Sequence, residues 1–256
     1  MNDKETQTRA SKLRSTLRGI SAVALLAAAS LGASTAQAAT WNSSNVQLLK
    51  GNSYELGDES RTILTYENAL GFDYGDSFFF IDVTEPFGEG TSYYSEFSPR
   101  FSLSKITGSD LSSGMIKDVM IATTLELGQG VRGKLIGVGL PLNIDGFAFA
   151  DVNFYLRKSD RDFATDQTDM GYQLTLVWKR PFSIGSAKMS FEGFFDYAFG
   201  EDSGSAPKKN NIITAPRLLM NLGSVEVGIE YQIWRNKFGI DGVDENVAQI
   251  MAKWVF

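Results

Sequence analysis

The sequence predicts an all-β fold, a 12-stranded antiparallel transmembrane β-barrel of the outer-membrane type. Three observations support this prediction. The chain ends in a segment whose alternate residues are apolar, it begins with an export signal, and the region between them contains an even number of alternating segments. A barrel strand in a bilayer alternates in this way because one face contacts lipid and the other faces the interior.

The last segment, Ala248–Phe256, has one apolar face and one mixed face. The apolar face consists of Ala248, Ile250, Ala252, Trp254 and Phe256. A final strand with an aromatic carboxyl terminus is typical of bacterial outer-membrane proteins, so we expect this strand to engage the barrel-assembly machinery. The same alternation is also compatible with an amphipathic edge strand of a soluble sandwich.

The amino terminus has the three parts of a secretory signal peptide. Arg9, Lys12, Arg14 and Arg18 form a positive region, an Ala- and Leu-rich run follows, and Ala36–Ala38 is a small-x-small cleavage site. We therefore expect residues 1–38 to be a cleaved signal peptide and residues 39–256 to form one barrel domain. No later segment approaches the roughly 20 apolar residues of a spanning helix.

Composition excludes several kinds of function. The chain has no cysteine and no histidine, which removes disulfides, Ser-His-Asp triads and histidine-zinc hydrolysis. We expect no cofactor, no metal and no enzymatic activity, since only Ser-Lys or carboxylate-pair chemistry remains and no spacing indicates it. Without residues 1–38, 19 basic and 28 acidic residues give a formal charge of −9, which argues against nucleic acid as a partner.

Alternation and turn residues together predict twelve strands, and no helical pattern competes with them. The predicted strands are Asn45–Lys50, Thr62–Asn68, Ser77–Thr84, Ser92–Ser104, Ile116–Leu127, Arg132–Leu140, Phe147–Arg157, Tyr172–Arg180, Lys188–Phe199, Asn211–Leu222, Ser224–Arg235 and Asn246–Phe256. An even number places both termini in the periplasm. The long polar connections then lie outside, with two exceptions. Lys105–Gly114 is long where a periplasmic turn is expected, and Gly128–Val131 is short where an outer loop is expected.

The polar faces of these strands carry more acids than bases. The predicted inward acids are Glu67, Asp82, Glu96, Asp118, Glu126, Asp151, Glu192, Asp196, Glu226 and Glu230, and the predicted inward bases are Arg100, Arg157, Lys179 and Arg217. This excess predicts a lumen that repels anions and favours neutral or cationic solutes. Alternatively, the lumen charges pair with one another and hold the barrel shut.

Aromatic side chains are also predicted to point inward. These are Phe78, Phe80, Tyr94, Tyr155, Phe194 and Trp234. Flat rings provide stacking faces for planar solutes, and a stacked base gains roughly 1–3 kcal/mol. The alternative is that the rings fill a small lumen, as in other small barrels.

Two Pro-Arg pairs suggest a constriction. Proline within a strand marks a bulge or an edge, and Pro99 and Pro216 each precede an inward arginine. A structural salt bridge is an equally good explanation of either arginine. The predicted substrate-binding residues are therefore Phe78, Phe80, Glu96, Arg100, Tyr155, Phe194, Asp196, Arg217, Glu230 and Trp234.

Several segments resemble one known family in order along the chain. These are Glu55–Asp58, Tyr74–Thr84, Tyr94–Ser104, Ile106–Leu111, Val119–Glu126, Phe194–Tyr197 and Trp234 with Gly239. They are similar to the nucleoside-specific outer-membrane channels, the Tsx-like proteins, and most of all to the OmpK branch. The resemblance implies a monomeric twelve-stranded barrel in outer-membrane lipid and lipopolysaccharide, with a narrow lumen for nucleosides and loops that phages or colicins use as receptors.

Two functions remain open at this point. One is a channel that passes nucleosides by facilitated diffusion through an acidic, aromatic-lined lumen. The other is a plugged surface barrel that serves as a phage or colicin receptor without selective transport.

Overall fold

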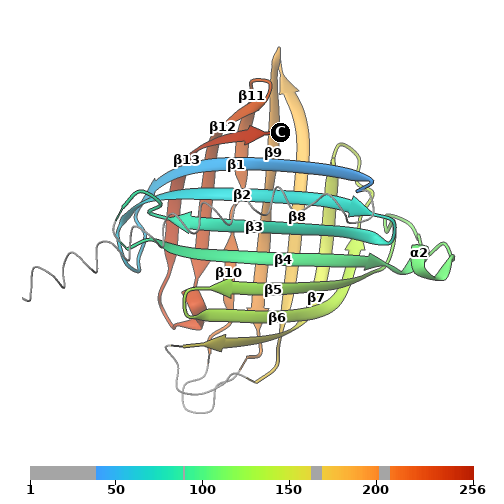
Figure 1. The fold of residues 1–256 in the computed structure, drawn as a ribbon, viewed down its shortest axis with the longest axis horizontal. Helices are drawn as coiled ribbons and strands as arrows, with labels where there is room; N and C mark the ends of the chain where they lie inside the picture. The colour runs from blue at the N-terminus through green and yellow to red at the C-terminus, as the bar shows by residue number, and fades with distance from the viewer. Residues whose placement is uncertain (1–38, 89, 163–168, 202–207) are drawn as a thin grey trace, which may run out of the picture.

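The computed structural model describes residues 39–88, 90–162, 169–201 and 208–256, which form a closed antiparallel β-barrel (Figure 1). The predicted signal peptide, residues 1–38, lies outside the described residues. The strands are β1 (Trp41–Asn52), β2 (Ser60–Phe72), β3 (Gly75–Thr84), β4 (Ser92–Ser102), β5 (Met120–Gly128), β6 (Val131–Pro141), β7 (Phe149–Arg161), β8 (Gly171–Ile184), β9 (Ala187–Phe199), β10 (Asn211–Thr214), β11 (Arg217–Asn221), β12 (Val225–Arg235) and β13 (Glu245–Val255).

Neighbouring strands pair in chain order, and the first pairs with the last. Asn45 of β1 lies opposite Val255 of β13, so no edge is left open. β10 and β11 both pair with β9 and β12, so together they form one wall strand. The described chain therefore contains twelve barrel strands, and the predicted fold class is confirmed.

The interruption between β10 and β11 lies at Ala215 and Pro216, but it is not the bulge that the proline predicted. Two residues separate Thr214 from Arg217, and two separate their partners Phe195 and Glu192 on β9. At Pro99 the pairing with β5 lapses without an extra residue, and the pairing with β3 continues. Both prolines interrupt hydrogen bonding because they lack an N–H, while the register is preserved.

The connection between β4 and β5 corrects three expectations. It contains the helix α2 (Leu103–Thr107), so the prediction that no helix interrupts the strands was wrong. Leu103 was expected to lie in the strand Ser92–Ser104 and Asp118 to face the lumen from a strand, but both lie in this connection. Ser102 caps the helix by accepting from Lys105 N, and Asp118 accepts from the hydroxyls of Ser102 and Ser104. Among the described residues, no helix has both the length and the apolar character needed to cross a membrane.

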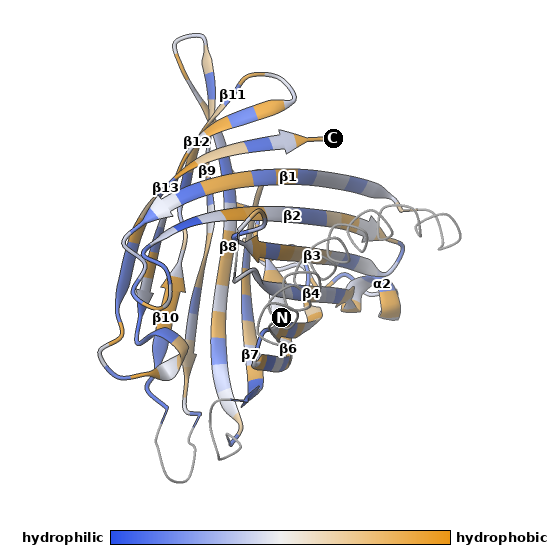
Figure 2. Ribbon diagram, turned by 60° about the vertical axis from the view of Figure 1, so that its left-hand side comes forward, coloured by the Kyte–Doolittle hydropathy of each residue, from blue (hydrophilic) through white to orange (hydrophobic). Residues whose placement is uncertain are grey.

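Apolar and polar residues alternate along the strands (Figure 2). In a closed barrel, successive side chains of a strand point to opposite faces, so this alternation separates an outer face from the interior. The large exposed side chains include Phe97, Phe154 and Ile229, which are 46%, 54% and 54% exposed and lie on the faces predicted to contact lipid. The other face is identified by ion pairs that join strands which are not neighbours. Such pairs can form only across the interior of the barrel, so they define the lumen side.

Candidate functional site in the barrel lumen

Ion pairs cross the lumen, and one of them joins β11 to β2. Arg217 Nη1 lies 3.0 Å from Glu67 Oε1, and Arg217 Nε lies 2.5 Å from Glu230 Oε2. Gln249 donates to the other oxygen of Glu230 at 2.7 Å. Arg217 and Glu230, both predicted site residues, are therefore inward and neutralise one another.

A second cluster joins β8, β9, β12 and β13. Lys253 Nζ lies 2.5 Å from Glu192 Oε1, and Lys179 Nζ lies 2.8 Å from Glu192 Oε2. Both lysines also approach Glu226, at 3.6 Å and 3.9 Å. Lys253 was missing from the predicted inward bases, although its place on the mixed face of the last strand could have revealed it.

Two further clusters involve β4 and β7. Arg100 Nε lies 2.7 Å from Asp76 Oδ1, and its Nη1 lies 3.3 Å from Asp151 Oδ2 on β7. Arg100 thus lies inward as predicted and is held by two carboxylates.

Arg157 on β7 reaches across β6 to Glu126 on β5, with its Nη2 2.6 Å from Glu126 Oε2. Gly133 on β6 leaves room for this pair, because a Cβ at that position would lie 2.0 Å from Glu126 Oε2. Arg157 also lies 3.7 Å from Glu201, just beyond β9, and Glu201 pairs in turn with Lys208. Glu201 and Lys208 were not among the predicted lumen residues, because they lie in or beside a connection and not within a strand.

Of the predicted inward acids that do lie on strands, three have no ion pair within the described chain. Each accepts instead from a neutral hydroxyl: Asp82 from Thr65 at 2.5 Å, Asp196 from Thr175 at 2.5 Å, and Glu96 from Tyr94 at 2.8 Å. Acids therefore still outnumber bases on the inward faces of the described strands, although Lys253 reduces the difference.

The predicted aromatic residues differ in how much ring surface they offer. Phe78, Phe80 and Tyr94 form a series across β3 and β4, with ring centroids 6.0 Å and 5.9 Å apart. The hydroxyl of Tyr94 bonds to Glu96, so this series leads directly to an acid without a cation partner. We call Phe78, Phe80, Tyr94 and Glu96 the aromatic wall.

Tyr155 and Phe194 are placed differently. Tyr155 is only 6% exposed and packs against Ala122 and Leu135, so it offers little ring surface. Phe194 lies beside the interruption between β10 and β11, where its carbonyl accepts from Thr214 Oγ1 and Ala215 N.

Trp234 lies near the outer mouth, where a connection folds over it. Lys237, in the 3-10 helix η1 (Lys237–Gly239), places its Nζ 4.4 Å from the centroid of the Trp234 ring, and Phe238 packs edge-on at 4.9 Å. Burial lowers the pKa of Lys237, against the opposing effect of Glu245, which accepts from it at 2.7 Å. The ammonium group of Lys237 thus already contacts the ring of Trp234.

The ten predicted site residues thus come together as lumen groups but not as one site. No group of acids that could hold a metal ion occurs in the described part of the chain. The arrangement can stack flat solutes on the aromatic wall and accept hydrogen bonds at Glu96 and Asp196. Which of these residues contact a substrate stays a prediction.

Comparison with known proteins identifies relatives of this chain. The family model described as nucleoside-specific channel-forming protein, Tsx, matches residues 36–254. The outer membrane protein OmpK of Vibrio parahaemolyticus is 29% identical over 112 residues, 42% of this chain and 41% of that protein. The nucleoside-specific channel-forming protein Tsx of Salmonella typhimurium (strain LT2) is 25% identical over 186 residues, 62% of this chain and 63% of that protein. The chain therefore covers less than two thirds of the length of either relative.

The solved structures similar to this chain include two porins. The KdgM porin in complex with disordered oligogalacturonate has a TM-score of 0.48 and 10% identity, covering 84% of this chain and 99% of that one. The NanC porin has a TM-score of 0.47 and 10% identity, covering 82% of this chain and 98% of that one. Because the family model matches most of the chain, the expected family is confirmed, and this chain belongs to the nucleoside-specific channel-forming Tsx family.

Proposed function

We propose that this outer-membrane barrel is a channel that passes small neutral or cationic solutes, above all nucleosides, by facilitated diffusion. The observation that carries the proposal is the aromatic wall. Three rings in series end at Glu96, whose carboxyl group bonds to a neutral hydroxyl and to no cation among the described residues. Stacking of a base on an aromatic ring contributes roughly 1–3 kcal/mol and is tolerant of base identity. Glu96 and Asp196 can accept from sugar hydroxyls or exocyclic amines.

Membership of a channel family supports this function, and the relatives named above are channel-forming or outer-membrane proteins and not enzymes. The proposal includes export through cleavage of residues 1–38. It also includes a monomeric state in outer-membrane lipid and lipopolysaccharide, and recognition of the last strand by the barrel-assembly machinery.

A second candidate is a plugged surface barrel that phages or colicins use as a receptor. It is favoured by the ion pairs that cross the lumen, such as Arg217–Glu67 and Lys253–Glu192, because cross-lumen pairs obstruct passage. On this hypothesis only outer connections such as Lys158–Met170, part of which lies outside the described residues, carry a phenotype.

Liposome swelling and single-channel conductance of refolded protein 39–256 test the two candidates. The test solutes are adenosine, thymidine and a sugar of matched size. The channel predicts saturable passage, or block of ion current, by the nucleosides and not by the sugar. Equal passage of all three solutes, or no conductance, contradicts the proposal and favours the receptor.

A further inference from the structure

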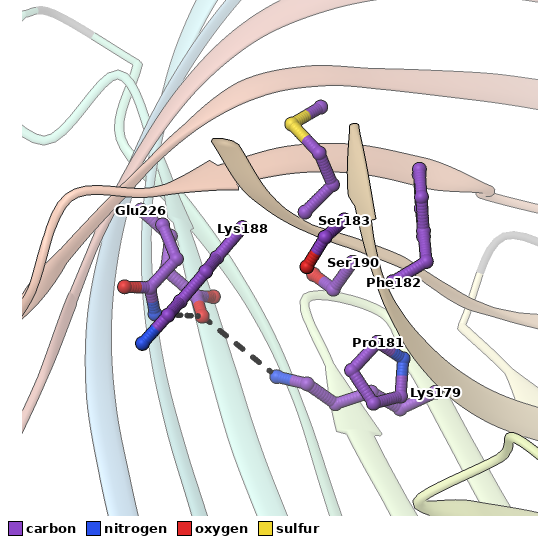
Figure 3. A pocket seen from close by; sticks show the side chains of 9 residues that line it. Lys179, Pro181, Phe182, Ser183, Lys188, Ser190 and Glu226 are labelled. Carbon is purple, nitrogen blue, oxygen red and sulfur yellow. Dashed lines mark hydrogen bonds and ion pairs between the residues drawn. The ribbon is translucent and has the colours of Figure 1, made fainter. Parts of the chain in front are cut away.

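The two ends of the barrel differ in how they are covered. At the periplasmic end, a recess of about 420 Å³ lies between the β8–β9 and β11–β12 hairpins, and in Figure 3 the amino group of Lys179 points towards Glu226 beside it. At the outer end, the connection between β12 and β13 folds back onto Trp234. We call this connection, residues 236–244, the outer strap. Its contacts place it over the mouth of the lumen.

The outer strap lies on the inner side of the wall. Trp234 is an even number of residues from Glu226 and Glu230, whose ion pairs identify the inward face of β12. Lys237 of the strap places its Nζ 4.4 Å from the centroid of the Trp234 ring and donates to Glu245 at 2.7 Å. Lys237 is 4% exposed and Glu245 is 0% exposed, so the protein encloses this contact. The strap therefore covers the inward face of the wall at Trp234.

The strap also reaches a distant strand of the wall. Arg161, at the end of β7, donates from Nη1 to the carbonyl oxygen of Phe238 at 2.9 Å. β8, β9 and β10 lie between β7 and β12, and strands spaced about 4.8 Å apart make the path along the wall roughly 19 Å. No arginine side chain spans that distance, so the strap itself extends from β12 across the mouth towards β7. Lys209 N donates to Gly239 O at 2.9 Å, which supports the strap from the connection before β10.

The backbone of the strap is strained where it meets Trp234. Phe238 has φ 57° and ψ 17°, and Asn236 has φ 47°, both in the left-handed region. Asparagine tolerates this region, but a bulky residue such as phenylalanine rarely adopts it. Contacts with Trp234 and Arg161 hold Phe238 in this conformation against the preference of its backbone. Strained residues of this kind occur at switch segments, where release of the contacts lets the backbone relax.

We propose that the outer strap is a lid, which closes the outer mouth by binding Trp234 and opens when a solute takes its place on that ring. This inference rests on the proposed channel function. In the closed state Lys237 and Phe238 contact the ring, and a planar or cationic solute competes with them for the same surface. The ends of the strap are joined, since Asn236 N donates to Asp244 Oδ1 at 2.9 Å, so the strap moves as one unit.

A reversible bridge between the strap and its neighbouring connection tests the lid. Lys209 Nζ lies 3.4 Å from Asp241 Oδ2 in the strap, and both side chains are exposed. The chain has no cysteine, so Lys209→Cys with Asp241→Cys can be joined by a short bis-methanethiosulfonate reagent and released with dithiothreitol. Adenosine flux and single-channel conductance of protein 39–256 are measured before and after bridging. We expect the bridge to remove most of both, and the reductant to restore them.

The matched control is Arg132→Cys with Asp162→Cys. This pair is also exposed, with Arg132 Nη2 2.6 Å from Asp162 Oδ1, but it joins β6 to the end of β7 and does not involve the strap. Its bridge should leave flux and conductance unchanged. Unchanged flux after bridging of the strap, or an equal loss in the control, overturns the lid.

A second measurement separates failure of the lid from failure of the channel. Nitroxide labels at positions 209 and 241 should show dipolar broadening of their spectra in the closed state, and adenosine should reduce it. Broadening that adenosine does not change overturns the lid, even where flux is normal. Absence of flux in the unmodified protein refutes the channel, and the spectra then still decide whether the strap moves.

Discussion

Two walls of the lumen differ in how their charges are compensated. On one side lies the ionic wall, which we define as Glu67, Glu192, Arg217, Glu226, Glu230 and Lys253. Each of these charges has an opposite charge within 4 Å. Next to it lies the aromatic wall, whose Phe80 is the cross-strand partner of Glu67 and whose Glu96 bonds only to the hydroxyl of Tyr94 among the described side chains. The ionic wall holds the shape of the barrel, while the aromatic wall leaves rings and one carboxylate for a solute.

Breaking the ionic wall should have the largest effect. Arg217→Met leaves Glu67 and Glu230 without their counter-ion, and removal of one partner from a buried ion pair typically destabilises a protein by about 3–5 kcal/mol. Urea unfolding of the refolded barrel, followed by tryptophan fluorescence, measures this loss. The matched control is Arg132→Met, because Arg132 is 51% exposed against 15% for Arg217. The exposed Arg132 pair should contribute below about 1 kcal/mol. Equal losses in both variants would contradict a special role of the ionic wall.

Removing a ring from the aromatic wall should come next. Phe80→Ala deletes the central ring of the series, which contacts both Phe78 and Tyr94. Loss of roughly 1–3 kcal/mol of stacking corresponds to a rise of at least about fivefold in the half-saturating nucleoside concentration. Flux measurements on liposomes test this. Phe79→Ala is the control because Phe79 contacts Tyr66 on the lipid side. A similar change in both variants would place the effect in folding and not in solute binding.

Neutralising the carboxylate of the aromatic wall should have the smallest effect. Glu96→Gln replaces an acid that no base compensates among the described residues, so at a pH where Glu96 is ionised the preference of the channel for cations should fall while its stability is retained. The reversal potential in a potassium chloride gradient measures this preference. Asp110→Asn makes the same change of charge in the periplasmic connection between β4 and β5 and should leave the potential unchanged. An equal shift in Asp110→Asn would assign the selectivity to the overall charge of the protein.

Alternation along the chain was sufficient to predict twelve strands and most of their inward residues, with Asp118 and Lys253 as exceptions, because a barrel in lipid repeats one local rule in every strand. The contacts within the lumen were not predictable in the same way. Glu67 and Arg217 are 150 residues apart, and no local pattern indicates that they meet. The helix α2 was not predicted, because its five residues make fewer than two helical turns and are too few for a periodic signal. The burial of Tyr155 depends on Ala122 and Leu135 from two other strands.

The ion pair between Glu67 and Arg217 has a consequence for how the barrel is assembled. It joins β2 to β11, with β12, β13 and β1 between them, so it requires the first and last strands to have met. A contact of such long range forms late, after most of the surface has been buried. Its loss should therefore accelerate unfolding and leave the rate of folding nearly unchanged. The pair therefore slows unfolding and lengthens the lifetime of the folded barrel in the membrane.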